Sequence, residues 1–251
     1  MELQPHRVEY WLNAKREDPE KFAQEVGEVC DLYLQANRLH ESGVHLISTD
    51  EKTGIQALER AAETIRMTPG QAERQESEYI RHGTQALIAN FVVATGEVIA
   101  PSIGATRTEE DFSRHIGQTI DIDPTGEWIF IADQLNIHQS EALVKLIAQR
   151  CGVTQALGEK GKNGILESMV SRAEFLRDKS HRIRFVYIPK HTSWLNQIEI
   201  WFSVLARKLL RRGNFSSVDE LKKRILSFID YFNKTMAKPY KWSYTGRPLM
   251  V

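Results

Sequence analysis

Three carboxylates stand where apolar segments meet the elements that follow them: Asp50, Asp133 and Glu199. Their surroundings read VHLISTDEKTG, EWIFIADQLNIHQ and YIPKHTSWLNQIEIWF. Anionic oxygen ligands on separate rigid elements are what hard divalent cations such as Mg²⁺ require. A pair of such ions can activate water and stabilise both oxygens of an in-line phosphoryl displacement. The three acids therefore predict metal-dependent chemistry on nucleic acid.

Each acid also has a purely structural interpretation. Asp50 could begin a turn, and Asp133 could cap a helix. Glu199 could close a capping box that Asn196 opens. The combination favours a site, because all three are expected over the same sheet edge. An apolar stripe would dock the first turn of the helix that carries Glu199, and it comprises Ile198, Trp201, Phe202, Leu205 and Leu209.

The elements that must position these acids follow from hydrophobic periodicity and turn signals. A mixed five-stranded α/β sheet with helices on its faces is expected, because a meander of three strands precedes two βα crossovers. If the first and fourth strands are parallel neighbours, Asp50 and Asp133 meet at one edge, each at the end of its strand. The expected strands are 44–48, 86–94, 98–103, 128–132 and 183–188, and the expected helices are 18–40, 108–120, 140–150, 165–176, 197–211 and 218–233.

Composition narrows the class of protein. The chain has 251 residues, of which 41% are hydrophobic and 26% charged, which is an ordinary globular balance. Cys30 and Cys151 form no CxxC pair, so a thiolate metal cage is excluded and reduced thiols in the cytosol are expected. No apolar run is long enough to span a membrane, and no signal-peptide core is present at the N-terminus.

The formal net charge of zero conceals an asymmetry. From His181 to the end the chain has 14 Lys/Arg against four Asp/Glu. A polyanionic partner at this basic end is one interpretation, and two solvated surfaces that neutralise each other are the other. Arg207, Lys208, Arg211 and Arg212 are expected on one face of a helix, where they would contact DNA phosphates without reading the sequence. The alternative is a solvated helix end.

The segments VHLISTDEKTG, ADQLNIHQS and PKHTSWLNQIEIWF resemble, in this order, the signature blocks of mariner-like DDE transposases of bacterial insertion sequences. The resemblance extends over nearly the whole chain. It implies an RNase H-like fold, with Asp50, Asp133 and Glu199 as the catalytic, metal-binding triad. It also implies two Mg²⁺ ions (or Mn²⁺), nicking of DNA at transposon ends, and strand transfer by the freed 3′-hydroxyl.

The chain departs from that family's pattern in three ways. Gln134 stands where Asn usually follows the second aspartate, which could weaken support of the metal site. Asp133 and Glu199 are about twice as far apart as is usual, and an insert at about 152–180, expected in a surface connection, accounts for the difference. The family's N-terminal helix-turn-helix region is also not found. Residues 1–42 are therefore interpreted as a helical segment leading from a missing DNA-recognition region, 43–235 as the catalytic domain and 236–251 as a tail.

Four further residues are candidates for supporting the metal ligands or contacting phosphate: Asn136, His138, His191 and Asn196. For His138, a solvent-facing position at a helix start is the favoured interpretation, and a place near the metal site is the alternative. His191 is discounted in the same way. Asn196 could cap a helix, support the metal ligands, or do both.

The leading hypothesis is a cytoplasmic, nucleoid-associated transposase catalytic domain that acts on DNA as a homodimer holding paired transposon ends. A catalytically silent remnant that binds DNA or regulates an intact copy is a second hypothesis. A cellular RNase H-like nuclease is a third, because a fold does not fix a function.

Overall fold

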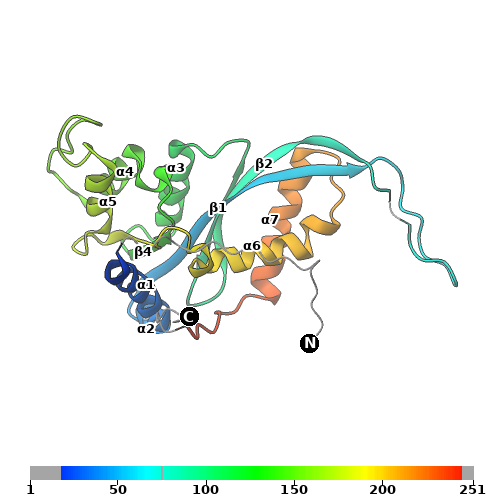
Figure 1. Cartoon of the computed structure of the whole chain (residues 1–251), viewed down its shortest axis with the longest axis horizontal. Coiled ribbons are helices and arrows are strands. Elements are labelled where there is room, and N and C mark those ends of the chain that lie inside the picture. Colours follow the sequence, from blue (N-terminus) through cyan, green and yellow to red (C-terminus); the bar gives the residue numbers. More distant parts are fainter. Residues whose placement is uncertain (1–17, 75, 245–251) are drawn as a thin grey trace.

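The computed structural model describes residues 18–74 and 76–244. Within these ranges five strands form one sheet in the order β3-β2-β1-β4-β5, as expected for a mixed sheet with helices around it (Figure 1). The strands are β1 (Val44–Arg60), β2 (Tyr79–Val92), β3 (Val98–Gly104), β4 (Glu127–Ala132) and β5 (Ile183–Tyr187). The α-helices are α1 (Pro19–Leu34), α2 (Ala36–Glu41), α3 (Glu109–Ile120), α4 (Glu141–Cys151), α5 (Met169–Arg177), α6 (Gln197–Lys208) and α7 (Val218–Thr235). Short 3₁₀ helices are η1 (Asn136–Gln139), η2 (Ser193–Leu195) and η3 (Leu210–Arg212).

The strand pairing brings the first and fourth strands together as expected. β1 pairs with β4 in parallel, from Val44↔Glu127 to Ser48↔Ile131. β4 also pairs with β5 in parallel, whereas β1, β2 and β3 form an antiparallel meander. β4 is buried from Trp128 to Ala132, which explains its continuous apolar sequence. The carboxyl ends of β1's parallel segment and of β4 therefore meet at one edge.

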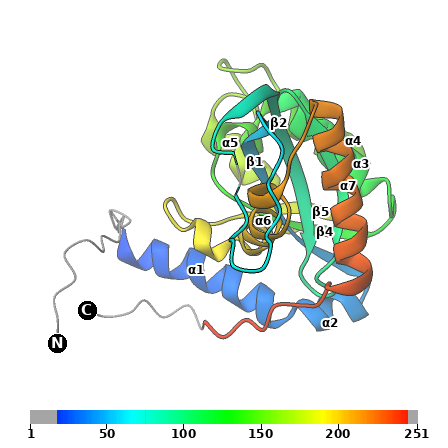
Figure 2. The same cartoon turned by 90° about the vertical axis from the view of Figure 1, so that its right-hand side faces the viewer.

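Hydrophobic side chains cover both faces of the sheet. One face packs against α3, α4 and α5, whereas α6 and α7 cover the opposite face over β1, β2 and β3 (Figures 1 and 2). α1 and α2 cover part of that same opposite face over β1, β4 and β5. Successive β1 residues alternate between the two faces, since Leu46 packs with α1 and Ile47 packs with α3 and α4. By this alternation Asp50 lies on the α1 and α6 side, and Glu51 on the α3 side.

Helix ends follow the expected signals at several positions. Asp18 caps α1 by accepting a hydrogen bond from the Lys21 backbone N–H at 2.9 Å. Thr108 and Asp111 form the expected capping box of α3. α4 ends at Gly152 in the left-handed conformation (φ 69°), which glycine adopts without strain. The expected single first helix is two helices, with Gln35 between them.

The first two strands are longer than expected. β1 continues to Arg60, paired with β2 as far as Tyr79, and the two strands form an arm that extends away from the sheet (Figure 1). The sequence missed this extension because its outer positions are polar or exposed, while Ile55 and Ala57 pack against α6 and α7. A turn does occur at Pro69-Gly70, between the bridged residues Thr68 and Gln71. The interpretation of Asp50 as a turn residue or strand end is therefore wrong.

Three residues of the insert between α4 and β5 are buried, although most of the insert is exposed or partly exposed. Leu166 and Leu176, 1% and 0% exposed, belong to the hydrophobic cluster formed with α3 and α4. Arg172 on α5 is also buried and donates hydrogen bonds to the backbone oxygens of Gln139 and Leu166, at 2.7 and 3.1 Å. The expectation of a simple surface insertion is therefore wrong, because the segment packs against the element that follows Asp133.

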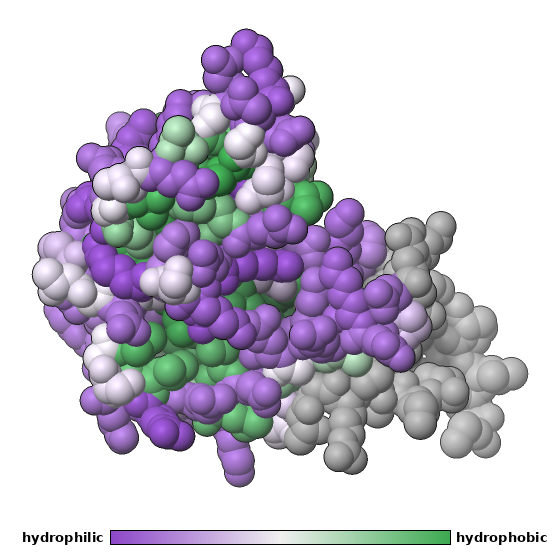
Figure 3. Space-filling model, turned by 90° about the vertical axis from the view of Figure 1, so that its left-hand side faces the viewer, coloured by the Kyte–Doolittle hydropathy of each residue, from purple (hydrophilic) through white to green (hydrophobic). Residues whose placement is uncertain are grey.

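Surface and boundary features complete the description. Figure 3 shows one face on which hydrophilic side chains surround smaller hydrophobic areas. Among the described residues no helix is long and apolar enough to cross a lipid bilayer. The predicted boundary after residue 42 stays a prediction, and residues 1–17 of the first segment and 245–251 of the tail lie outside the described part of the chain.

Candidate metal centre

Asp50 lies inside β1, two residues after the parallel pairing with β4 ends at Ser48. The side chain is 8% exposed. Its Oδ1 accepts a hydrogen bond from the Glu51 backbone N–H at 2.7 Å, and its Oδ2 accepts one from Asn196 Nδ2 at 3.2 Å. A central strand and two donors thus fix the direction of this carboxylate.

Asp133 follows β4 directly and faces the same edge of the sheet. Its Oδ1 accepts a hydrogen bond from the Leu135 backbone N–H at 2.9 Å and lies 2.7 Å from His138 Nδ1. The side chain is 39% exposed. Glu199 lies in the first turn of α6, where the buried residues Ile198, Trp201 and Phe202 hold the helix against the sheet.

Burial and neighbouring charges raise the pKa values of two of the three candidate acids. Burial raises the pKa of Asp50 to about 7, and the negative charges of Asp133 and Glu51 add to the effect. Burial also raises the pKa of Glu199; Lys52 opposes this shift and the charge of Asp133 adds to it. The negative charge of Asp133 therefore contributes to the raised pKa of both other acids.

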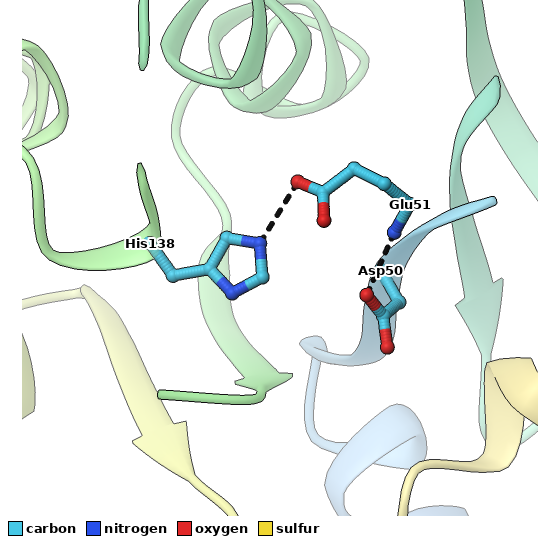
Figure 4. Close-up of side chains that lie close together, drawn as sticks. All are labelled: Asp50, Glu51 and His138. Atoms are coloured by element: carbon cyan, nitrogen blue, oxygen red, sulfur yellow. Dashed lines mark hydrogen bonds and ion pairs between the residues drawn. The ribbon is translucent and has the colours of Figure 1, made fainter. Parts of the chain in front are cut away.

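His138 and Glu51 form a buried pair beside this cluster (Figure 4). His138 Nε2 lies 2.9 Å from Glu51 Oε1, and the two side chains are 0% and 1% exposed. Burial alone would lower the pKa of His138, but hydrogen bonds and charges of Asp133 and Glu51 outweigh burial and raise it to about 10. Burial of Asp133 acts to raise its pKa, but the hydrogen bond and positive charge of His138 hold that pKa below its usual range. The histidine thus lies between two carboxylates, which favour its protonated form.

The favoured interpretation of His138 as a solvent-facing residue is therefore wrong, and the alternative place near the acids is the observed one. Sequence reasoning also missed Glu51. The signal that could have revealed it is the Asp-Glu pair, because adjacent strand residues point to opposite faces and a charged residue on the core face needs a partner.

A sequence profile described as DDE superfamily endonuclease matches residues 45–222, a range that contains all three carboxylates. The chain belongs to the DDE superfamily endonucleases. This confirms the family resemblance, whereas an origin in a bacterial insertion sequence stays a prediction. A comparison with curated protein sequences finds no match.

Solved structures of a DDE transposase share the fold of this family member. The Mos1 mariner paired-end complex with Mn is 14% identical with a TM-score of 0.53, covering 89% of this chain and 59% of that chain. The Mos1 strand transfer complex is 14% identical with a TM-score of 0.53, covering 91% and 58%. The catalytic domain of Mos1 transposase is 11% identical with a TM-score of 0.51, covering 89% and 85%. The likeness confirms the RNase H-like fold, and this chain spans about 59% of the chain in the first complex.

In this DDE endonuclease, Asn196 connects the strand that bears Asp50 to the helix that bears Glu199. Its Nδ2 donates to Thr49 O at 3.0 Å and to Asp50 Oδ2, and its Oδ1 accepts from the Ser48 hydroxyl. Its side chain makes no capping hydrogen bond to α6, so the capping-box interpretation is wrong. Ser48 Oγ instead accepts a hydrogen bond from the Ile198 backbone N–H at 2.9 Å.

The remaining candidates form no hydrogen bond with the three carboxylates in the described part of the chain. Gln134 donates its amide to Ile188 O at 3.1 Å and so fixes the end of β5 rather than a carboxylate. Asn136 is exposed in η1. His191 is exposed and adopts a left-handed conformation (φ 63°), which is uncommon for a residue other than glycine. Their proposed roles toward phosphate stay predictions.

The four basic residues after Glu199 do not share one continuous helix. α6 ends at Lys208, and Arg211 and Arg212 lie in η3. The sequence missed the change because Leu209 and Leu210 continue the apolar pattern. All four side chains are exposed, and in the described part of the chain no carboxylate forms a salt bridge with any of them. The four basic side chains are thus free to contact phosphate, but the prediction that they share one face of a single helix is wrong.

The chemistry of the three predicted ligands suits a hard divalent cation. Asp50, Asp133 and Glu199 provide carboxylate oxygens, and Asp133 Oδ2 has no hydrogen-bond partner among the described residues. Among the described residues, the group whose ligand atoms all lie within 4.8 Å of one another is a different set, Asp50, Glu51 and His138, and the three acids Asp50, Asp133 and Glu199 do not meet that distance. We favour the first set, because carboxylate oxygens already occupy both ring nitrogens of His138.

Proposed function

We propose that this DDE endonuclease cleaves DNA strands at transposon ends and joins the freed 3′-hydroxyl to a target. The observation that supports the proposal is the position of Asp50 and Asp133 near the carboxyl ends of the parallel β1–β4 pair, with Glu199 in the first turn of the helix that packs on this sheet. Two carboxylates on a rigid sheet and one on a docked helix make a preorganised cation site.

Each acid would act as a ligand of Mg²⁺ or Mn²⁺, and we propose two ions. When bound, such ions supply activated water and stabilise charge on the reacting phosphate. The carboxylates would hold such ions, and Asn196, which donates to Asp50 Oδ2, would fix the direction of that ligand. No side chain of the protein needs to act as a nucleophile, because water and then the DNA 3′-hydroxyl attack phosphorus.

DNA is the proposed substrate because structures of Mos1 with the same fold include a paired-end complex with Mn and a strand transfer complex. The exposed Arg207, Lys208, Arg211 and Arg212 follow the Glu199 helix and would neutralise phosphates. A homodimer follows from the need to hold two ends at once.

The test is nicking and strand transfer with DNA that carries the element's terminal inverted repeats, in Mg²⁺ or Mn²⁺. We expect activity in the wild type and a loss of at least about 100-fold in Asp133→Asn, the scale that removing one electrostatic catalytic group produces. Folding of the variant is checked by circular dichroism, and DNA binding by fluorescence anisotropy.

Three outcomes contradict the proposal. Equal activity of wild type and Asp133→Asn would remove the triad assignment. Salt-sensitive DNA binding without cleavage by the wild type would support the catalytically silent alternative. Preference for an RNA–DNA hybrid over duplex DNA would indicate a cellular RNase H-like nuclease.

A further inference from the structure

The carboxylate of Asp133 is held asymmetrically. Oδ1 accepts a hydrogen bond from the Leu135 backbone N–H and contacts His138 Nδ1, whereas Oδ2 has no hydrogen-bond partner among the described residues. Two donors on one oxygen fix the rotation of the carboxylate and leave the other oxygen available. Such an arrangement directs a ligand without occupying its binding atom.

His138 is itself fixed on several sides. Its Nδ1 lies 3.1 Å from the backbone oxygen of Asp133, which can only accept, so this nitrogen carries a proton. Its ring packs on Phe112 with centroids 4.3 Å apart. Its backbone oxygen accepts a hydrogen bond from the Tyr187 hydroxyl at 2.6 Å, and Arg172 holds the next carbonyl, that of Gln139. The histidine therefore has little freedom to turn.

Glu51 completes the chain of contacts from the opposite side of the ring. Its Oε1 lies within hydrogen-bond distance of His138 Nε2, at 2.9 Å, and Figure 4 shows it reaching from β1 toward the histidine. Its backbone N–H binds Asp50 Oδ1 at 2.7 Å. Glu51 thus contacts Asp50 through its backbone N–H and reaches Asp133 through the imidazole of His138.

We propose that Glu51 and His138 are positioning residues, which orient the Asp133 carboxylate toward the cation through the series Glu51–His138–Asp133. The proposal rests on the proposed function, in that Asp133 is taken to be a ligand. Hydrogen-bonded partners of metal ligands commonly act in this way, and their loss weakens metal affinity by roughly 10- to 100-fold.

Direct ligation by Glu51 and His138 is the competing explanation, since their ligand atoms lie near those of Asp50. Two observations favour positioning. Glu51 lies on the other face of β1 from Asp50, and the contacts to Asp133 and Glu51 occupy both nitrogens of His138. Nδ1 carries a proton and so has no lone pair for a metal, and Nε2 is directed at Glu51 Oε1, 2.9 Å away.

The experiment measures Mn²⁺ binding to the metal-free full chain, without DNA, by electron paramagnetic resonance titration. The variants are Glu51→Ala, Glu51→Gln, His138→Ala and His138→Asn, with metal-free thermal unfolding as the folding check. Glu51→Gln keeps an oxygen that can accept from Nε2, and His138→Asn keeps an N–H near the position of Nδ1. Glu59→Gln is the matched control, because Glu59 is another β1 glutamate paired with a histidine, His82 at 2.7 Å, on the arm.

We expect both alanine variants to bind Mn²⁺ roughly 10- to 100-fold more weakly. Glu51→Gln and His138→Asn should keep most of the affinity, and Glu59→Gln should match the wild type. Glu51→Gln carries the decisive comparison, because it removes the same charge as Glu51→Ala but retains the hydrogen bond.

Equal weakening in Glu51→Gln and Glu51→Ala would overturn the proposal in favour of charge or direct ligation. Lower thermal stability with unchanged Mn²⁺ affinity would also overturn it, because the pair would then be merely structural. If His138→Ala does not fold, the two Glu51 variants still decide. Failure of the proposed function is seen separately, as wild-type protein that binds Mn²⁺ but does not cleave DNA.

Discussion

The side chain of Asn196 links two segments that are distant in the sequence, β1 and the start of α6. It is 0% exposed, and its amide bonds to Ser48, Thr49 and Asp50. Since the same side chain precedes α6, it fixes the start of the helix that bears Glu199 relative to β1. The residue therefore acts between elements rather than within its own helix.

Replacing Asn196 with Ala should lower the free energy of unfolding by about 1–3 kcal/mol, because its buried partners would be left without their hydrogen bonds. Chemical denaturation measures the change. Asn136→Ala is the control, since Asn136 is exposed and such changes stay within about 0.5 kcal/mol. A similar loss in both variants would show that the buried network contributes nothing specific.

His115 gives a prediction about pH. Burial lowers its pKa to about 3, and its Nδ1 lies 2.9 Å from Ser102 Oγ. The unfolded chain binds a proton below its ordinary pKa of about 6.5, whereas the folded protein does not until near 3. The free energy of unfolding should therefore fall as pH falls through this window.

Denaturation of wild type and His115→Gln at pH 7 and pH 5 measures this effect. We expect the variant to lose less stability between the two pH values than the wild type does. An identical pH dependence would contradict the assignment, because the difference between the proteins isolates this one group from all other titrations.

Among the elements, the insert between α4 and β5 packs against the turn that follows Asp133. α5 and the loop before it contribute Leu166, Arg172 and Leu176 to the interior, and Arg172 binds the carbonyl of Gln139. That carbonyl belongs to η1, the turn that presents His138 to Asp133. The insert between Asp133 and Glu199 thus stabilises η1, the turn that carries His138.

Arg172→Ala should lower the free energy of unfolding by about 1–3 kcal/mol, because two backbone carbonyls would be left without charged donors. It should also speed amide hydrogen exchange in residues 136–139, which the arginine holds. Arg114→Ala is the control, since its ion pair with Asp111 is at the surface and is worth about 1 kcal/mol or less. Unchanged exchange in 136–139 would show that the insert does not support the turn.

Charge is distributed unevenly over the whole molecule. The carboxylates gather at the edge where β1 and β4 diverge, whereas basic residues without salt bridges to the described carboxylates follow along the end of α6 and η3. One of the three acids, Glu199, thus lies on the same helix as the first two of these basic residues. Protein charge of this kind sets affinity and its dependence on salt, but not sequence specificity.

Binding to duplex DNA should weaken as salt rises, with a slope set by the number of phosphates that the protein neutralises. Replacing Arg207 and Arg211 with Ala should reduce that slope by about 0.9 for each phosphate that is no longer neutralised. Fluorescence anisotropy over a salt series measures it. Lys145→Ala is the control, because Lys145 pairs with Glu141 on α4, and an equal change there would disprove a local DNA-binding surface.

The sequence alone determined the class and strand content of the sheet and most helix starts, and it proposed the three acids. It could do so because buried strands, caps and apolar stripes leave local patterns that do not depend on the rest of the fold. β4, the capping box at Thr108 and the start of α6 all follow such patterns. The parallel pairing of β1 with β4 could also be predicted from the sequence, since parallel crossovers and hairpins allow few strand orders.

Only the tertiary structure decided what surrounds the acids. Glu51 meets His138 across 87 positions of sequence, and Asn196 meets Asp50 across 146. No periodicity encodes such pairs, because they form where the β1–β4 pairing and the packed insert bring separate segments together. The same holds for the exposed basic residues, whose helix ends at Lys208 although the apolar pattern continues. Burial of a charge is a property of the assembled core, so it cannot be read from one segment.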